Sequence, residues 1–138
     1  MLVEDEDTFT FGTTTIRCKL TPGHTDGVLS FFVNIEDGEN SIIAAMHGGI
    51  GTNSMKTSFL NRYNLSFDCR EKFRKGLREL SKEHVDLVMG NHPGQNDTYK
   101  KLDKVLAGES IIDPEEWNKF LIKTEKNFDK FIEEDKNL

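Results

Sequence analysis

Seven residues, Thr21-Pro22-Gly23-His24-Thr25-Asp26-Gly27, separate two runs of strand-forming sequence. A β-branched run (13–18) precedes them and an apolar run (28–33) follows them. This order predicts a strand, a tight turn and a second strand, because Pro22 presets φ and Gly23 lets the backbone bend sharply. His24 would then lie on a stiff loop anchored at both ends, which is a suitable position for a metal ligand.

A second turn, Gly90-Asn91-His92-Pro93-Gly94, has the same character and follows the short apolar segment 85–89. His24 and His92 each follow an expected strand and are each braced by proline and glycine. If the two strands point the same way in one sheet, both imidazoles lie at one edge of it. Zinc binds imidazole nitrogen, but a catalytic site needs three protein ligands, so two histidines are too few for one site.

A glycine-rich segment, His47-Gly48-Gly49-Ile50-Gly51, lies between these two turns. It follows the apolar run 42–46, which we expect to be a strand covered on both faces and paired in a hairpin with 28–35. The glycines indicate a sharply bent backbone or a close approach to a ligand. His47 is a further possible ligand, and the polar segment 54–65 is expected to be a loop that forms a substrate wall.

Helical patterns fill most of the second half of the chain. Asp68 and Glu71 predict a capped helix, and a short helix is expected over about 98–106. Asp113-Pro114 predicts the start of a last helix that ends near 134. The apolar stripe of that last helix is typical of a helix that covers a sheet; its members are Trp117, Phe120, Leu121, Thr124, Phe128, Phe131 and Ile132.

Composition limits the possible classes of protein. With 138 residues, 36% of them hydrophobic, the chain can form at most one domain. A net charge of −6 argues against a general nucleic-acid or anionic-membrane surface, and no apolar run has the length of a membrane span. The acidic start (1–7) is unlike a signal peptide, and it leaves the compartment unassigned. Residues 1–8 and 136–138 are expected to fray.

The motifs T-P-G-H-T-x-G (21–27) and N-H-P-G (91–94) resemble the metallo-β-lactamase superfamily, and most closely the β-lactamase subclass without a cysteine zinc ligand. The resemblance runs from about 11 to 98, and more weakly to the end. It implies an α/β (α+β) fold in which 1–138 form the C-terminal half of an αββα sandwich, with one mixed sheet and helices on one face. The family's first metal motif, H-x-H-x-D-H, does not occur in this sequence.

The resemblance also implies roles for individual residues. His24 is similar to a ligand of the first of two zinc ions, and His92 is similar to a ligand of the second. The expected chemistry is attack by a zinc-bound hydroxide on an amide or ester bond of a β-lactam-like small molecule. Residues that would contact substrate or support the zinc ligands are His47, Gly49, Asn91, Gln95 and Asn96.

The segment 48–51 is similar to a G-S-I-G-type turn of that subclass, with Gly49 where serine often stands. Many relatives, such as glyoxalase II-like hydrolases, carry a bridging aspartate after the preceding strand, and another lactamase subclass carries cysteine there. This chain has neither residue at that place. The pattern therefore favours a β-lactamase-like parent over a glyoxalase-like one.

Two functional classes stay open from the sequence. In the first, the chain is the C-terminal portion of a zinc hydrolase, is inactive alone, and has the missing N-terminal half as its partner. In the second, it is a non-catalytic half-fold module, or a self-associating interaction domain that binds no metal. The open sheet face then needs a cover, most simply a second copy of the chain in a homodimer. Lactonases, thioesterases, phosphodiesterases and sulfatases share the fold, so the fold does not select the substrate.

Overall fold

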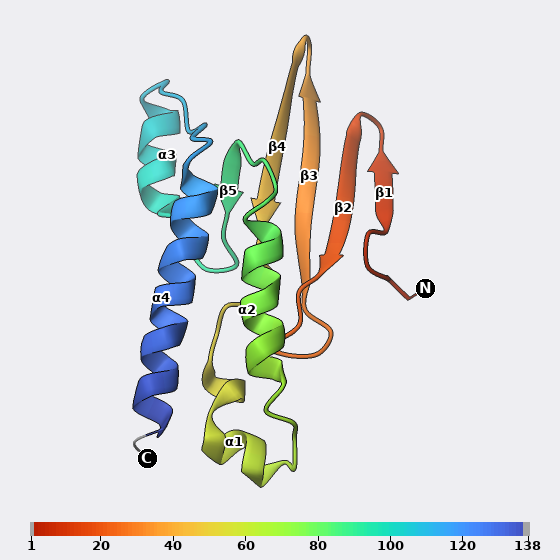
Figure 1. Cartoon of the computed structure of the whole chain (residues 1–138). Coiled ribbons are helices and arrows are strands. Elements are labelled where there is room, and N and C mark those ends of the chain that lie inside the picture. Colours follow the sequence, from red (N-terminus) through yellow and green to blue (C-terminus); the bar gives the residue numbers. More distant parts are fainter. Residues whose placement is uncertain (1, 137–138) are drawn as a thin grey trace.

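A computed structural model describes residues 2–136 as one mixed sheet flanked by helices (Figure 1). The strands lie in the order β1-β2-β3-β4-β5. They span Thr8–Phe11 (β1), Thr14–Leu20 (β2), Leu29–Asp37 (β3), Asn40–Met46 (β4) and Leu87–Met89 (β5). The helices span Asn53–Met55 (η1, a 3₁₀ turn), Thr57–Arg62 (α1), Cys69–Leu80 (α2), Thr98–Leu106 (α3) and Glu116–Lys136 (α4).

The strands predicted on either side of His24 are confirmed. β2 and β3 pair antiparallel, with Cys18 opposite Phe31, and β3 and β4 form the predicted hairpin. Gly38 makes the hairpin turn with φ of 63°, a conformation that glycine adopts without strain. The last strand, β5, is parallel to β4.

Strand direction brings three loops to one edge of the sheet. β2 and β4 are both antiparallel to β3, and β5 is parallel to β4, so β2, β4 and β5 all point the same way. Their carboxyl ends therefore lead into the segments 21–28, 47–52 and 90–97 at a common edge, which we call the loop edge (Figure 1). The condition for His24 and His92 to share one edge is met.

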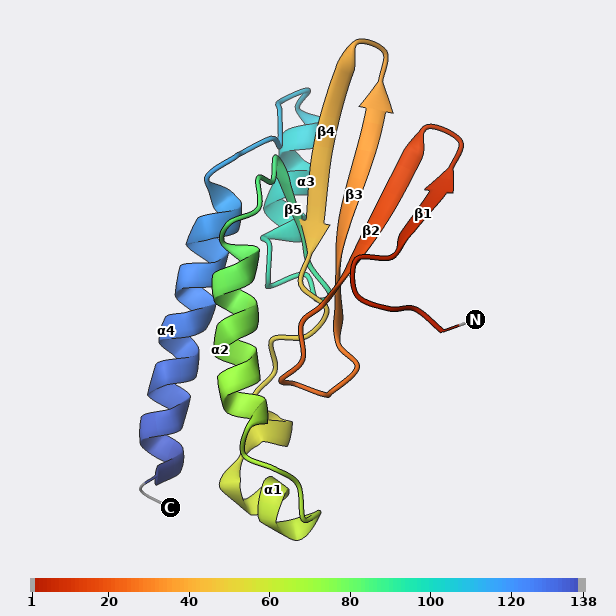
Figure 2. The same ribbon diagram turned by 45° about the vertical axis from the view of Figure 1, so that its right-hand side comes forward.

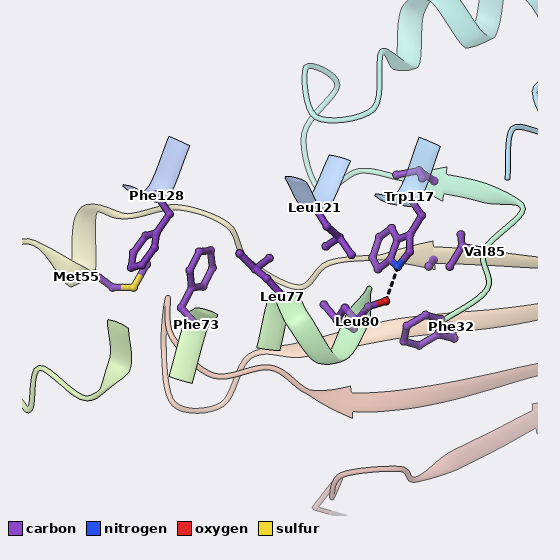
Figure 3. Close-up of a cluster of buried hydrophobic side chains, with 11 residues drawn as sticks. Phe32, Met55, Phe73, Leu77, Leu80, Val85, Trp117, Leu121 and Phe128 are labelled. Atoms are coloured by element: carbon purple, nitrogen blue, oxygen red, sulfur yellow. Dashed lines mark hydrogen bonds between the residues drawn. The ribbon is translucent and has the colours of Figure 1, made fainter. Parts of the chain in front are cut away.

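The hydrophobic core lies between the sheet and two neighbouring helices, α2 and α4 (Figures 1 and 2). Phe73 and Leu77 of α2 meet Trp117 and Phe128 of α4, and all four side chains are almost fully buried (Figure 3). The Trp117 indole Nε1 donates a hydrogen bond to the Leu80 carbonyl oxygen at 2.9 Å. The predicted apolar stripe of the last helix is thus confirmed as a sheet-covering face.

Helices α2 and α4 cover one face of the sheet, and on the other face no helix covers β1 to β4 within residues 2–136. Helix α3 lies at the β5 edge (Figure 2). The uncovered face forms an apolar groove of about 470 Å³, which we call the open face. Its lining comprises Val3, Phe9, Phe11, Ile16, Cys18, Leu29, Phe31, Val33, Met46 and Met89. The prediction that 42–46 is covered on both faces is met on the helix side, where Ala45 packs into the core. On the other side Met46 lines the groove, and a cover for that face stays a prediction. The predicted mixed sheet with helices on one face is confirmed.

Two local predictions in the region 54–71 are corrected. The segment 54–65, expected as a loop, contains η1 and α1 and buries Met55 and Leu60 against the core side. The predicted capping box of α2 is absent: Asp68 has helical backbone angles and makes no capping hydrogen bond, and its carboxylate pairs with Lys72 instead.

The amino-terminal segment lies along β2 as an edge segment. The Glu6 amide donates to the Cys18 carbonyl at 2.8 Å, and the Cys18 amide donates to the Asp7 carbonyl at 2.8 Å. The Glu6 carboxylate also pairs with Arg17 at 2.9 Å and with Lys19 at 2.6 Å. Of the expected frayed ends, Met1 and residues 137–138 lie outside the described residues, and fraying of the rest stays a prediction.

Both cysteines are free thiols, with Cys18 buried and Cys69 partly exposed. Across residues 2–136, every helix is too short or too polar to cross a bilayer.

Trp117→Phe should lower the free energy of unfolding by about 2 kcal/mol, because it removes buried volume and the hydrogen bond from the indole to the Leu80 carbonyl. Urea denaturation followed by circular dichroism measures the change. Leu102→Ala is the control, since Leu102 is 50% exposed on α3 and its truncation should stay within about 0.5 kcal/mol. Equal effects of the two substitutions would contradict the assigned core.

Candidate metal and substrate site

Hydrogen bonds to the side chain and to the backbone carbonyl hold His24 at the loop edge. Its Nδ1 lies 2.7 Å from the Gly51 carbonyl oxygen, so Nδ1 carries the proton and donates it. The Ser54 hydroxyl donates to the His24 carbonyl oxygen at 2.5 Å. This arrangement leaves Nε2 as the unprotonated nitrogen, which is the tautomer that a metal ligand requires.

The glycine-rich segment is in contact with the His24 ring. A Cβ at Gly49 would lie 3.0 Å from His24 Cδ2, and one at Gly51 would lie 3.2 Å from His24 Cε1. A side chain at either position would therefore press on the imidazole, which would have to shift by a few tenths of an ångström. The close approach that the glycines indicated is confirmed, and the neighbour is a histidine of the same chain.

His47 is buried beneath this contact. Its Nδ1 accepts a hydrogen bond from the Gly49 amide at 3.1 Å, and its ring packs edge-on against Phe73. Burial, with a smaller contribution from His24, lowers the pKa of His47 to about 4. The imidazole is therefore neutral at pH 7, and it supports the turn that holds His24.

The His92 loop is tied to the same segment through Asn91. The Asn91 side-chain nitrogen donates to the carbonyl oxygens of His47 at 2.9 Å and Gly48 at 2.8 Å. The segment 47–51 thus contacts both predicted ligand loops, one through Gly51 and the other through Asn91. His92 itself is exposed at the loop edge.

The side chains of Gln95 and Asn96 make hydrogen bonds to the backbone in and next to the His92 loop. The Gln95 side-chain oxygen accepts a hydrogen bond from the backbone N–H of Asn91 at 2.9 Å. The Asn96 side-chain nitrogen donates a hydrogen bond to the Val88 carbonyl at 3.1 Å. Their hydrogen bonds fix the shape of the turn that presents His92. A role in substrate contact for either residue stays a prediction.

The remaining histidine, His84, lies before β5 and therefore at the opposite edge of the sheet. Its Nε2 lies 2.8 Å from an Asp86 carboxylate oxygen. The Asp86 carboxylate also accepts a hydrogen bond from the Ile43 backbone amide at 2.9 Å. The His84–Asp86 pair therefore stabilises the edge of the sheet opposite the loop edge.

The donor set fits part of a zinc site. His24 presents a correctly protonated ring and His92 an exposed one, at a common edge. Within residues 2–136, no group of three or more histidine, cysteine, aspartate or glutamate side chains is placed to hold a metal ion. A catalytic zinc would need ligands from outside the described chain.

A hollow of about 430 Å³ opens beside His24, between the 23–26 turn, the η1–α1 segment and the start of α2. Its wall is fixed from behind by a buried ion pair between Arg70 and Asp135, 2.6 Å apart. Arg70 also donates to the Met55 carbonyl at 2.6 Å, and Asp135 accepts the Thr57 hydroxyl at 2.6 Å. The last turn of α4 thereby anchors the segment that carries Ser54.

Sequence reasoning did not single out Ser54, Arg70 or Asp135. An aspartate in the last turn of a helix opposes the helix dipole, and that local conflict was the available signal. Its partners lie far away in the chain, so no spacing rule points to them.

Comparison with solved structures gives similarity to metallo-β-lactamases. One from Cronobacter sakazakii superposes with a TM-score of 0.87 at 20% identity, over 100% of this chain and 49% of that chain. The FEZ-1 metallo-β-lactamase from Legionella gormanii gives 0.84 at 21% identity, over 97% and 51%. BJP-1, a subclass B3 metallo-β-lactamase of Bradyrhizobium japonicum, gives 0.83 at 19% identity, over 98% and 51%.

No protein-family model matches the chain, and no curated protein matches it in sequence. The chain spans about half the length of the structures that it matches. It therefore has the fold of one half of a metallo-β-lactamase, as the resemblance predicted.

Asp135→Asn should lower the free energy of unfolding by about 3 kcal/mol at pH 7, because it leaves the Arg70 charge buried without its counterion. Burial raises the pKa of Asp135, but the hydrogen bonds from Thr57 and Arg70 outweigh it and hold the pKa below its usual value. The stabilisation is therefore complete above the unfolded pKa of about 4 and is lost as the pH falls through the folded value.

Chemical denaturation of the wild-type chain and of the Asp135→Asn variant from pH 7 to pH 3 tests this prediction. The difference between their free energies of unfolding should shrink below about pH 4. Asp129→Asn is the matched control. Asp129 lies on α4, as Asp135 does, and its half-exposed carboxylate pairs with Arg74 of α2. Its loss should cost less than about 1 kcal/mol. A difference for Asp135→Asn that is unchanged at pH 3 would contradict the carboxylate's role.

Proposed function

We propose that this chain is the C-terminal portion of a zinc-dependent hydrolase of the metallo-β-lactamase type. The observation that carries the proposal is the pair of braced histidine loops on one edge of a sheet with that fold, with His24 fixed in the ligand tautomer. His24 would bind one zinc ion and His92 another. The half that is absent here would supply the remaining ligands.

Bound zinc would supply a hydroxide at neutral pH for attack on an amide or ester carbonyl of a small molecule. This chain's part in that reaction is positional. Gly51 and Ser54 orient the His24 ring, and Gly49 leaves room for it. Asn91 holds the His92 loop against the same turn. Alone, with one ligand for each ion, the chain is expected to be inactive.

The open face supports the proposal from the other side of the sheet. An apolar groove of this size is unfavourable in water. The matched structures have about as much chain again beyond the part that this chain covers. We propose that this missing half of the fold packs on the open face.

The alternative is a half-fold module that binds no metal and associates with itself through the open face. The hydrogen bonds at His24 favour the hydrolase, because they fix the orientation of an imidazole that a loop without a ligand role has no need to hold.

The coding sequence upstream of this chain gives the first test: it should encode H-x-H-x-D-H. Protein from the longer reading frame should then contain about two zinc ions per chain by elemental analysis. His24→Ala and His92→Ala should each remove about one ion, because each removes one ligand.

His84→Ala is the matched control and should leave the zinc content unchanged, because His84 lies at the opposite edge. This chain by itself should hold less than about 0.1 zinc per molecule. Zinc retained in both the His24→Ala and His92→Ala proteins would overturn the ligand assignment.

Phe11→Lys should weaken self-association of the isolated chain, since Phe11 is 66% exposed on the open face and its replacement puts a charge into the groove. Sedimentation velocity over a concentration series measures the change. Tyr99→Lys is the control, because Tyr99 is 70% exposed on α3, away from the groove. A wild-type chain that stays monomeric throughout would contradict association through the open face.

A further inference from the structure

We infer that the hollow beside His24 binds an uncharged, apolar group of the substrate. This inference rests on the proposed function only in treating the bound group as part of a hydrolase substrate. The binding property itself depends on the walls of the hollow, which belong to this chain.

Apolar side chains line the hollow next to the candidate metal ligand. They are Phe59, Leu60, Leu65 and Cys69, and His24 lines the same hollow. Leu65 is 50% exposed although it faces a concave surface. Cys69 is partly buried, and this burial raises the pKa of its thiol. A volume of about 430 Å³ accommodates a short alkyl or aryl group.

The charges at the mouth of the hollow disfavour an anion. Asp26 and Asp68 line it together with Lys72, whose ammonium lies 3.2 Å from Asp68 and 3.8 Å from Asp26. Lys72 is thus shared between two carboxylates, and it is the only lysine or arginine among the described residues that line the hollow. A substrate carboxylate placed here would meet net negative charge.

The hollow is also formed in advance of binding. The Leu65 amide donates to the Leu60 carbonyl at 2.9 Å, which closes the turn after α1. Arg70 and Asp135 hold the start of α1 from behind, and Ser54 links η1 to His24. A ligand therefore need not order these walls, which lowers the cost of binding.

A titration of the ¹⁵N-labelled chain followed by NMR tests the inference with two probes that share the same hexanoyl chain. N-methylhexanamide is uncharged, and hexanoate carries a carboxylate. The amide should shift the backbone signals of Leu60, Leu65 and Cys69 in a saturable way. Hexanoate should bind there at least about fivefold more weakly, because of the carboxylates at the mouth.

Leu65→Gln should weaken binding of the amide at least about threefold, because it removes apolar contact area. Leu102→Gln is the matched control, since Leu102 is equally exposed on α3, and it should leave the affinity unchanged. Hexanoate binding as tightly as the amide, or amide shifts confined to open-face residues such as Phe31 and Met46, would overturn the inference.

Neither probe needs zinc, so this experiment fails or succeeds independently of the zinc measurement. Probe binding with no zinc in the longer protein would reject the proposed hydrolase and leave the apolar hollow in place. Zinc bound as proposed, with no probe in the hollow, would reject only this inference.

Discussion

The two histidine loops depend on the backbone of one short segment, 47–51. Its carbonyl oxygens accept hydrogen bonds from His24 on one side and from Asn91 on the other. Because β4 ends directly before this segment, the position of both loops is set by the sheet itself. Residues that contact a backbone in this way are positioned more accurately than residues on free loops. Glycine at 49 and 51 leaves room for the His24 ring, which a larger residue would crowd.

The fold followed from sequence wherever the signal was local. The strands beside His24, the hairpin to 46 and the apolar stripe of α4 all rest on periodicity within single segments, and the structure has them. The segment 54–65 was missed because its polar residues resembled a loop. Met55 and Leu60 nevertheless carried a signal, since apolar residues recur there with helical spacing at 55, 59, 60 and 63. A cover for the second face of β4 has no local signal, because the apolar run reads the same whether or not something packs in the groove.

The candidate site was predictable in its residue types and not in its supporting contacts. His24 and His92 were recognised from proline and glycine at fixed offsets, and strand direction then brings them to one edge. The support from Ser54, and from Arg70 with Asp135, joins residues up to 65 positions apart in the sequence. Such pairs leave no pattern in a single sequence. The role of His47 also needed the structure, since burial and not spacing makes it a neutral support.

The strand order of this sheet has a consequence for how the chain acquires its structure. Spatial order follows chain order from β1 to β5, so each strand pairs with the strand that immediately precedes it in sequence. Loop closure is therefore short for the first three pairings, whereas β5 joins β4 only after the segment 47–86 has closed, which costs more entropy. The strands β1 to β4 can therefore pair early, before the longer connection that brings β5 beside β4 is closed.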